Sequence, residues 1–184
     1  MAERQTQKSD LTEDDIQFIM SNTDFNREQV VNWHNDFKKQ CPTGRLTKAD
    51  FINFYKKLIK GDHADEDQLC SIIFDVYDSD ANGSIDFSEF LIAFWVRAKG
   101  DIKEKLAWLF DVYDYDNSNY ITSWELVKML KLLFNIKGIK EDPYKKAVAI
   151  MNALDRSKDG KVSKPEFIAG CTKDTQLRSL FSPF

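Results

Sequence analysis

Apolar residues recur at helical spacing along most of the chain, and short polar stretches interrupt the pattern. On both sides of one such stretch the apolar positions follow the spacing i, i+3, i+4, i+7, i+8: Leu69, Ile72, Ile73, Val76 and Tyr77 before it, and Phe87, Phe90, Leu91, Phe94 and Trp95 after it. This spacing places apolar side chains on one face of an α-helix. The pattern therefore predicts an all-α protein built from amphipathic helices.

The polar stretches are copies of one another. Three of them cover residues 78–89, 114–125 and 155–166, and a fainter copy covers residues 39–50. Helical periodicity flanks each copy, which predicts four helix–loop–helix units. We expect these units to form two paired lobes, with short β bridges between paired loops. The N-terminal lobe would span residues 1–97, and the C-terminal lobe, with an apolar tail, residues 98–184.

The order of residue types in the three clear copies is that of an EF-hand loop, with Asp first, oxygen-bearing residues at alternate positions, and Glu twelfth. Calcium is a hard cation that takes about 6–8 oxygen ligands at roughly 2.3–2.6 Å. The sixth position must turn sharply, so glycine is favoured there. Gly83 and Gly160 fill it in two loops, and Asn119 fills it in the third.

We predict three calcium sites from these positions. The second loop offers the side chains of Asp78, Asp80, Asn82, Asp86 and Glu89 and the carbonyl of Ser84. The third offers the side chains of Asp114, Asp116, Ser118 and Glu125 and the carbonyl of Tyr120, with Thr122 at the ninth position. The fourth offers the side chains of Asp155, Ser157, Asp159 and Glu166 and the carbonyl of Lys161, with Ser163 at the ninth position.

The charges around each loop predict the order of calcium affinity among the three sites. Four basic residues intersperse the fourth loop: Arg156, Lys158, Lys161 and Lys164. Because affinity depends on the charge of the ligands, we expect calcium to bind most tightly at the second loop, then the third, then the fourth. The first loop has Lys39 where Asp is needed, Cys41 at its third position and Pro42 next to it, so we expect it to bind no ion.

At this point the chain resembles the neuronal calcium sensor family, the group of recoverin, neurocalcin and frequenin. The resemblance rests on the disabled loop Cys41-Pro-Thr-Gly-Arg-Leu46, on Asn22–Phe25, and on the segment from Gly100 to Leu106. It implies that calcium exposes an apolar groove in the N-terminal half, where an amphipathic helix of a target docks. The target would be a channel, receptor, kinase, cyclase or exchange factor. The positions that match the groove are Phe25, Trp33, Phe37, Phe51, Phe54, Tyr55, Leu58, Ile59, Phe90, Leu91 and Phe94.

Both ends of the sequence add an expectation. The sequence begins Met1-Ala2, whereas N-myristoylation requires Gly after Met. We therefore expect no stable membrane anchor. The C-terminal residues Leu177, Leu180, Phe181 and Phe184 are apolar. Our hypothesis is that this tail occupies part of the groove until a target displaces it.

Composition narrows the function. The formal net charge is −4 and there is no basic block, which argues against nucleic-acid binding. Three widely spaced cysteines and no long apolar stretch favour a cytoplasmic protein. The two histidines lie near no recognisable nucleophile, so we expect no enzyme activity. We predict a calcium sensor, monomeric or weakly dimeric. The alternative is a calcium buffer that binds ions without opening, and magnesium is the ion expected to compete.

Overall fold

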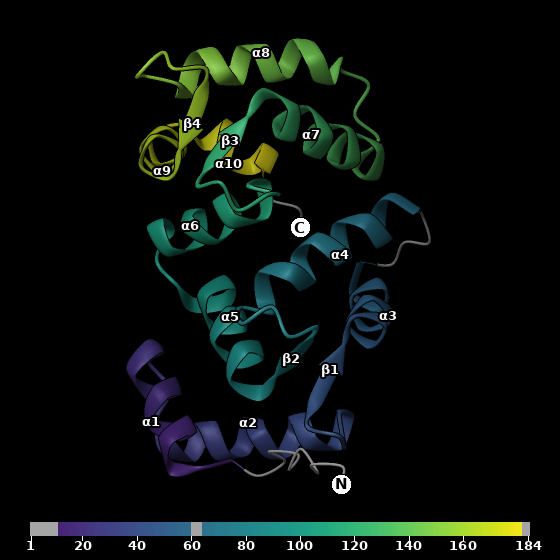
Figure 1. The fold of residues 1–184 in the computed structure, drawn as a ribbon, viewed down its shortest axis with the longest axis vertical. Helices are drawn as coiled ribbons and strands as arrows, with labels where there is room; N and C mark the ends of the chain where they lie inside the picture. The colour runs from purple at the N-terminus through teal and green to yellow at the C-terminus, as the bar shows by residue number, and fades with distance from the viewer. Residues whose placement is uncertain (1–10, 60–63, 182–184) are drawn as a thin grey trace, which may run out of the picture.

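Four helix–loop–helix units follow one another along the chain and stack along its longest axis (Figure 1). The computed structural model describes residues 11–59 and 64–181, without the side chains of residues 55–59 and 64. The described elements are α1 (Glu13–Asn22), α2 (Arg27–Gln40), β1 (Arg45–Thr47), α3 (Lys48–Ile59), α4 (Ala64–Tyr77), β2 (Ser84–Asp86), α5 (Phe87–Lys99), α6 (Ile102–Tyr113), β3 (Tyr120–Thr122), α7 (Ser123–Lys137), α8 (Pro143–Leu154), β4 (Lys161–Ser163), α9 (Lys164–Lys173) and α10 (Thr175–Phe181).

Two short antiparallel sheets join the units in pairs. Strand β1 pairs with β2, placing Leu46 opposite Ile85, and β3 pairs with β4, placing Ile121 opposite Val162. These four central side chains are buried. The structure confirms the predicted all-α fold with paired lobes and β bridges between their loops.

The last residue of each predicted calcium loop also stands in the first turn of the next helix. In the second loop the Asp86 side chain accepts a hydrogen bond from the Glu89 N–H, and the Glu89 side chain accepts one from the Asp86 N–H. Capping boxes also form at Thr122 with Glu125 and at Ser163 with Glu166. The same glutamates are therefore both helix caps and candidate metal ligands.

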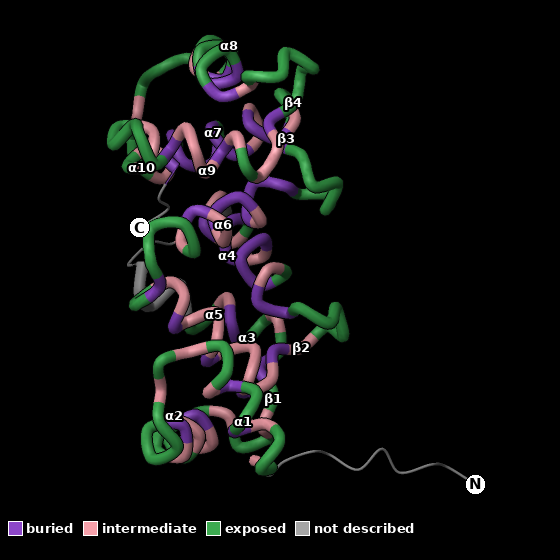
Figure 2. The backbone as a smooth tube through the Cα atoms, turned by 90° about the vertical axis from the view of Figure 1, so that its left-hand side faces the viewer, coloured by how far each residue is buried: buried purple, intermediate pink, exposed green. Residues whose placement is uncertain are grey.

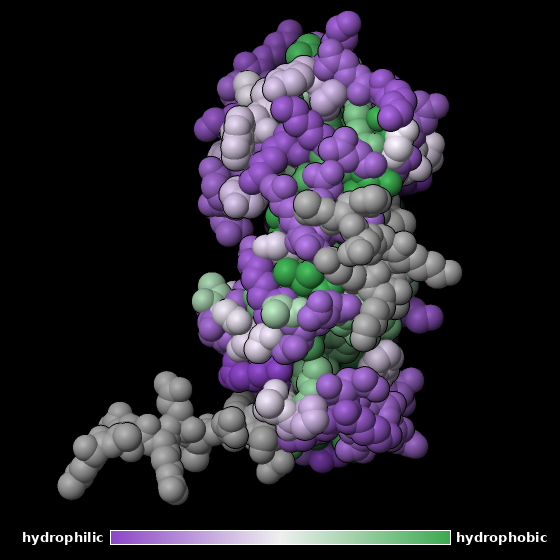
Figure 3. Space-filling model, turned by 90° about the vertical axis from the view of Figure 1, so that its right-hand side faces the viewer, coloured by the Kyte–Doolittle hydropathy of each residue, from purple (hydrophilic) through white to green (hydrophobic). Residues whose placement is uncertain are grey.

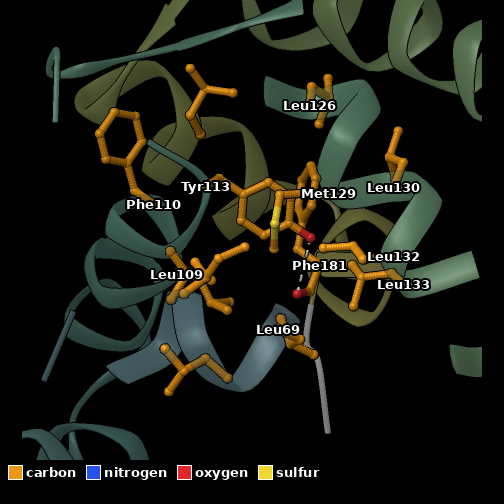
Figure 4. Close-up of a cluster of buried hydrophobic side chains, with 14 of the residues drawn as sticks. Leu69, Leu109, Phe110, Tyr113, Leu126, Met129, Leu130, Leu132, Leu133 and Phe181 are labelled. Atoms are coloured by element: carbon orange, nitrogen blue, oxygen red, sulfur yellow. Dashed lines mark hydrogen bonds between the residues drawn. The ribbon is translucent and has the colours of Figure 1, made fainter. Parts of the chain in front are cut away.

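The main core runs through both lobes. Leu69 of α4 lies in one apolar cluster with Leu109 of α6 and Leu132 of α7 (Figure 4). This cluster extends from Leu46 in the first hand to Phe181 at the end of α10. A second cluster joins α1, α2 and α5: Ile16, Ile19, Val30, Phe37, Phe87 and Leu91. The helix that leads into the second calcium loop is thus packed directly against the C-terminal lobe.

The C-terminal helix α10 lies in the C-terminal lobe. Phe181 is fully buried, and its ring centroid lies 5.0 Å from that of Tyr113 and 5.0 Å from that of Phe167. The Tyr113 hydroxyl donates a hydrogen bond to the Phe181 carbonyl over 3.3 Å (Figure 4). Lys137 Nζ donates to the carbonyls of Ser179 and Leu180.

For Leu177, Leu180 and Phe181 this placement contradicts the hypothesis that the tail occupies part of the N-terminal groove. Leu177 and Leu180 pack against the same core as Phe181. The reason is that the rings of Tyr113 and Phe167 and the surrounding apolar core bury Phe181 within its own lobe. Phe184 lies outside the described residues, as do Met1 and Ala2.

Candidate calcium sites and apolar groove

The second loop brings three of its predicted acidic ligands together. One carboxylate oxygen each of Asp78, Asp80 and Glu89 lies within 4.8 Å of the others. The Asp78 carboxylate is buried and accepts hydrogen bonds from the N–H groups of Asn82 (3.0 Å) and Gly83 (2.8 Å). These bonds orient the carboxylate toward the centre of the loop. Three carboxylates this close repel one another unless a cation joins them.

Glu89 closes the second loop from its far end. Its Oε1 accepts a hydrogen bond from the Ser79 N–H over 2.9 Å, and its Oε2 accepts one from the Asp86 N–H over 2.9 Å. The Asn82 side-chain oxygen accepts from the N–H of Ser84 over 3.0 Å. Side chains predicted as ligands thus face one another around the loop, each held by a backbone donor.

The third loop repeats this arrangement with deeper burial. Carboxylate oxygens of Asp114, Asp116 and Glu125 lie within 4.8 Å of one another. Glu125 is only 2% exposed, and burial raises the pKa of the Asp114 carboxyl above its ordinary value. A hydrogen bond with the Ser118 side chain lowers the pKa of Asp116. The Ser118 hydroxyl also donates to the Tyr120 carbonyl over 3.1 Å, which brings two further predicted ligands together.

The fourth loop has similar bonds but a looser set of acids. Among the residues described, clusters of three acidic side chains within 4.8 Å occur in the second and third loops but not here. Asp155 accepts from the Gly160 N–H over 2.9 Å, and Asp159 from the Lys161 N–H over 3.0 Å. Hydrogen bonds, first from the Ser163 side chain and then from backbone N–H groups, lower the pKa of Glu166 to about 2. Its lower rank in affinity stays a prediction.

The backbone of each of the three predicted calcium loops passes through the left-handed region twice. At the sixth position φ is +84° for Gly83, +67° for Asn119 and +83° for Gly160, in line with the residue types found there. The fourth position is also left-handed, at Ala81 (+54°), Asn117 (+55°) and Lys158 (+60°). Sequence reasoning missed this second turn, because neither alanine nor lysine is a residue that signals positive φ.

The loops before β2, β3 and β4 project as exposed segments from one side of the molecule (Figure 2).

The first loop differs from these three in its side chains. Lys39 pairs with Asp36 over 2.7 Å, and Asp50, at the twelfth position, caps α3 through Thr47. Asp50 thus caps its helix as the glutamates of the other loops do, and what sets the first loop apart is Lys39 at the position where the others carry Asp.

One residue of the first hand reaches into the second loop. The guanidinium Nη1 of Arg45 donates to the Asn82 side-chain oxygen (3.2 Å) and to the Ser84 hydroxyl (2.8 Å). The Asn82 oxygen is a predicted calcium ligand, so an ion bound there would compete with Arg45 for this oxygen and would meet the positive charge of its guanidinium. The first hand thus supplies a side chain that would compete with the ion for a ligand of the second loop.

Replacing Arg45 with alanine is expected to raise calcium affinity at the second loop by about two- to fivefold, because a competing donor and a like charge are removed. Calorimetric titration of chelator-stripped protein measures the change. The matched control is Lys48→Ala, which removes one positive charge from the same hand but pairs with Asp75 (2.7 Å). An equal increase in both variants would mean a general charge effect and contradict the specific role of Arg45.

An apolar groove lies between α2, α3 and α5. It encloses about 160 Å³ and is lined by Trp33, Phe37, Phe54 and Phe90 of the predicted set, joined by Asp36, Gln40, Cys41 and Leu46. The Trp33 ring lies 4.9 Å from that of Phe94 and 6.3 Å from that of Phe25, so the aromatic row continues beyond the cavity. Apolar side chains also show through the polar surface on the side that carries α3 and α4 (Figure 3).

Two residues predicted for the groove are core residues instead. Phe51 is fully buried and packs on the rings of Phe74 and Tyr77. Leu91 is fully buried in the cluster of α1, α2 and α5. The prediction was wrong for both, because α3 and α5 each have apolar side chains on two faces and only one face meets the groove. The side chains of Tyr55, Leu58 and Ile59 lie outside the described residues.

Comparison with known proteins agrees with this geometry. Models of an EF-hand domain pair match residues 42–96 and residues 103–172. S-modulin of Aquarana catesbeiana is 28% identical, over 95% of this chain and 90% of its own length. Recoverin of Homo sapiens is 28% identical, over 92% of this chain and 88% of its own length. Across the described residues, no helix combines the length and apolar character required to cross a membrane. The chain belongs to the EF-hand family of calcium-binding proteins.

Proposed function

We propose that this calcium sensor binds Ca²⁺ at its second, third and fourth loops and then offers the groove of Trp33, Phe37, Phe54 and Phe90 to the amphipathic helix of a target. The observation that carries the proposal is the position of Glu89. This residue closes the second loop and stands in the first turn of α5, next to Phe90. If the Glu89 carboxylate moves onto an ion, the first turn of α5 should therefore move with it.

The connection between ion and groove runs through α5. In the structure both oxygens of Glu89 accept backbone hydrogen bonds within the loop. A bound calcium ion takes the twelfth-position glutamate as a bidentate ligand. Moving the carboxylate onto the ion would move the first turn of α5. The Phe90 ring, whose centroid lies 5.3 Å from that of the Phe37 ring, would move with it. In sensor EF-hands this kind of shift exposes an apolar groove.

The partner that fits is a helix with an apolar face, since the groove is a row of aromatic rings. We propose a channel, receptor, kinase, cyclase or exchange factor as the target. We propose that the sensor binds it in the cytoplasm and is itself a monomer or weak dimer. We also propose the lobe division at residues 97 and 98, two residues before the Gly100–Asp101 junction between α5 and α6.

The test is binding of an apolar dye, anilinonaphthalene sulfonate, with calcium and with chelator. Calcium is expected to raise the dye fluorescence of the wild-type protein, and Phe54→Ala is expected to lose most of that increase, because Phe54 lines the groove and is 45% exposed. The control is Val148→Ala, an exposed apolar residue of α8 that does not line the groove. A wild-type protein that binds calcium with no rise in fluorescence would be a buffer, and the sensor mechanism would fail.

A further inference from the structure

A second concave surface lies where α4, α7 and α8 meet. It encloses about 690 Å³ and is lined by Asp65 and Gln68 of α4, Trp124, Lys128 and Lys131 of α7, and Tyr144 of α8. We name it the α7–α8 groove. It shares no lining residue with the groove of Trp33 and Phe54. The proposed target-binding mechanism makes no use of it.

Two lysines of this groove are held by aromatic rings. Lys128 Nζ lies 3.4 Å from the ring centroid of Tyr115 and 5.2 Å from that of Trp124. Lys131 Nζ lies 4.5 Å from the ring centroid of Tyr144 and 2.8 Å from its hydroxyl. Within the part of the chain that the structure describes, neither ammonium group lies within 4.0 Å of a carboxylate oxygen. Both positive charges are thus fixed in place and available to an anion from outside.

The same surface exposes large apolar side chains. Trp124 is 64% exposed and Tyr144 is 58% exposed. Val127 and the buried Leu132 also line the groove. Tryptophan and tyrosine are enriched where proteins bind one another, because their rings combine apolar area with few rotatable bonds. The groove therefore offers an apolar seat between two fixed cations.

Charge indicates what kind of partner fits. Residues 123–154, which form α7, α8 and their connection, contain six lysines and three acidic residues, whereas the whole chain has a net charge of −4. One of the three acids, Glu125, is buried in the third loop. Asp65, the acidic residue of the groove lining, accepts a hydrogen bond from Asn135 over 3.1 Å. The groove is thus a local positive region on an acidic protein, and it is complementary to a negative partner.

We propose that the α7–α8 groove binds an acidic peptide segment of a partner protein. An apolar side chain of the peptide would lie between Trp124 and Tyr144, and its carboxylates would contact Lys128 and Lys131. A concave site with walls from three helices fits an extended chain better than a flat, anionic bilayer. The partner is therefore distinguished by its charge from a helix that needs only an apolar face.

The experiment uses the full-length protein with calcium and a displayed library of random 12-residue peptides. We expect the enriched peptides to include a set rich in Asp and Glu around an aromatic or aliphatic residue. Fluorescence anisotropy then measures the affinity of individual peptides. Binding of the acidic set is expected to weaken about tenfold or more in the double variant Lys128→Glu, Lys131→Glu, and to weaken in Trp124→Ala.

The matched control is the double variant Lys99→Glu, Lys103→Glu, which makes the same charge change at exposed lysines that lie outside residues 123–154 and do not line the groove. The acidic set should bind this control within about twofold of the wild-type affinity. Calcium titration and circular dichroism show whether each variant is folded. The proposal is overturned if no acidic peptides are enriched, or if both double variants weaken binding equally. It is also overturned if the groove variant loses only sedimentation with phosphatidylserine vesicles, which would make the surface a membrane contact.

Discussion

Replacement of Glu89 by glutamine is expected to weaken calcium binding at the second loop roughly 100-fold, or about 2.7 kcal/mol. The glutamine keeps the size of the side chain but loses the charge and the bidentate coordination that close the site. Glu89 is also one of three acids whose oxygens lie within 4.8 Å of one another, so no neighbouring acid can replace it without rebuilding the loop. Calorimetric titration of chelator-stripped protein should show one ion fewer at micromolar calcium.

The control separates the metal from the helix cap. Glu104 forms a capping box with Asp101 at the start of α6, accepting the Asp101 N–H over 2.6 Å, but belongs to no calcium loop. Glu104→Gln should leave the number of bound ions unchanged. The same substitution at Glu125 and at Glu166 tests the predicted order of affinity. Loss of the tightest site in Glu166→Gln, and of the weakest in Glu89→Gln, would contradict that order.

The helices and loops could be predicted from the sequence because their signals are local. The spacing of Asp78, Asp80 and Glu89 follows from what a single ion requires, and twelve residues are enough to state it. The pairing of loops also follows from the repeat, since each β bridge joins consecutive units. Asn119 could be assigned to the turn because asparagine tolerates positive φ.

Contacts between distant helices could not be predicted in the same way. In α5 the residues Phe87, Leu91 and Trp95 are buried, whereas Phe90 and Phe94 are half-buried and lie beside the groove. Periodicity identifies all five as apolar and does not say which neighbour each face meets. The packing of α4 against α6 and α7 could not be predicted from periodicity for the same reason. It depends on side chains from separate hands that complement each other only in three dimensions.

Replacement of Phe181 by alanine is expected to lower the free energy of unfolding by about 3–5 kcal/mol, because a fully buried ring is removed from a packed core. The ring contacts both Tyr113 and Phe167, which come from the third and fourth hands. Urea unfolding followed by circular dichroism, at one fixed calcium concentration, measures the loss. Leu180→Ala on the same helix should cost less, since Leu180 is only partly buried.

The same variant decides between two roles for the C-terminal helix. If Phe181 belongs to the C-terminal core, Phe181→Ala lowers stability, and Tyr113→Phe, which removes the hydrogen bond to the Phe181 carbonyl, costs about 1 kcal/mol. If the helix were instead a removable plug of the N-terminal groove, Phe181→Ala would leave stability unchanged and raise dye binding without calcium. The burial of Phe181 in the C-terminal lobe predicts the first outcome. Its ring contacts side chains of the third and fourth hands, so moving it to another site would expose apolar surface of both hands.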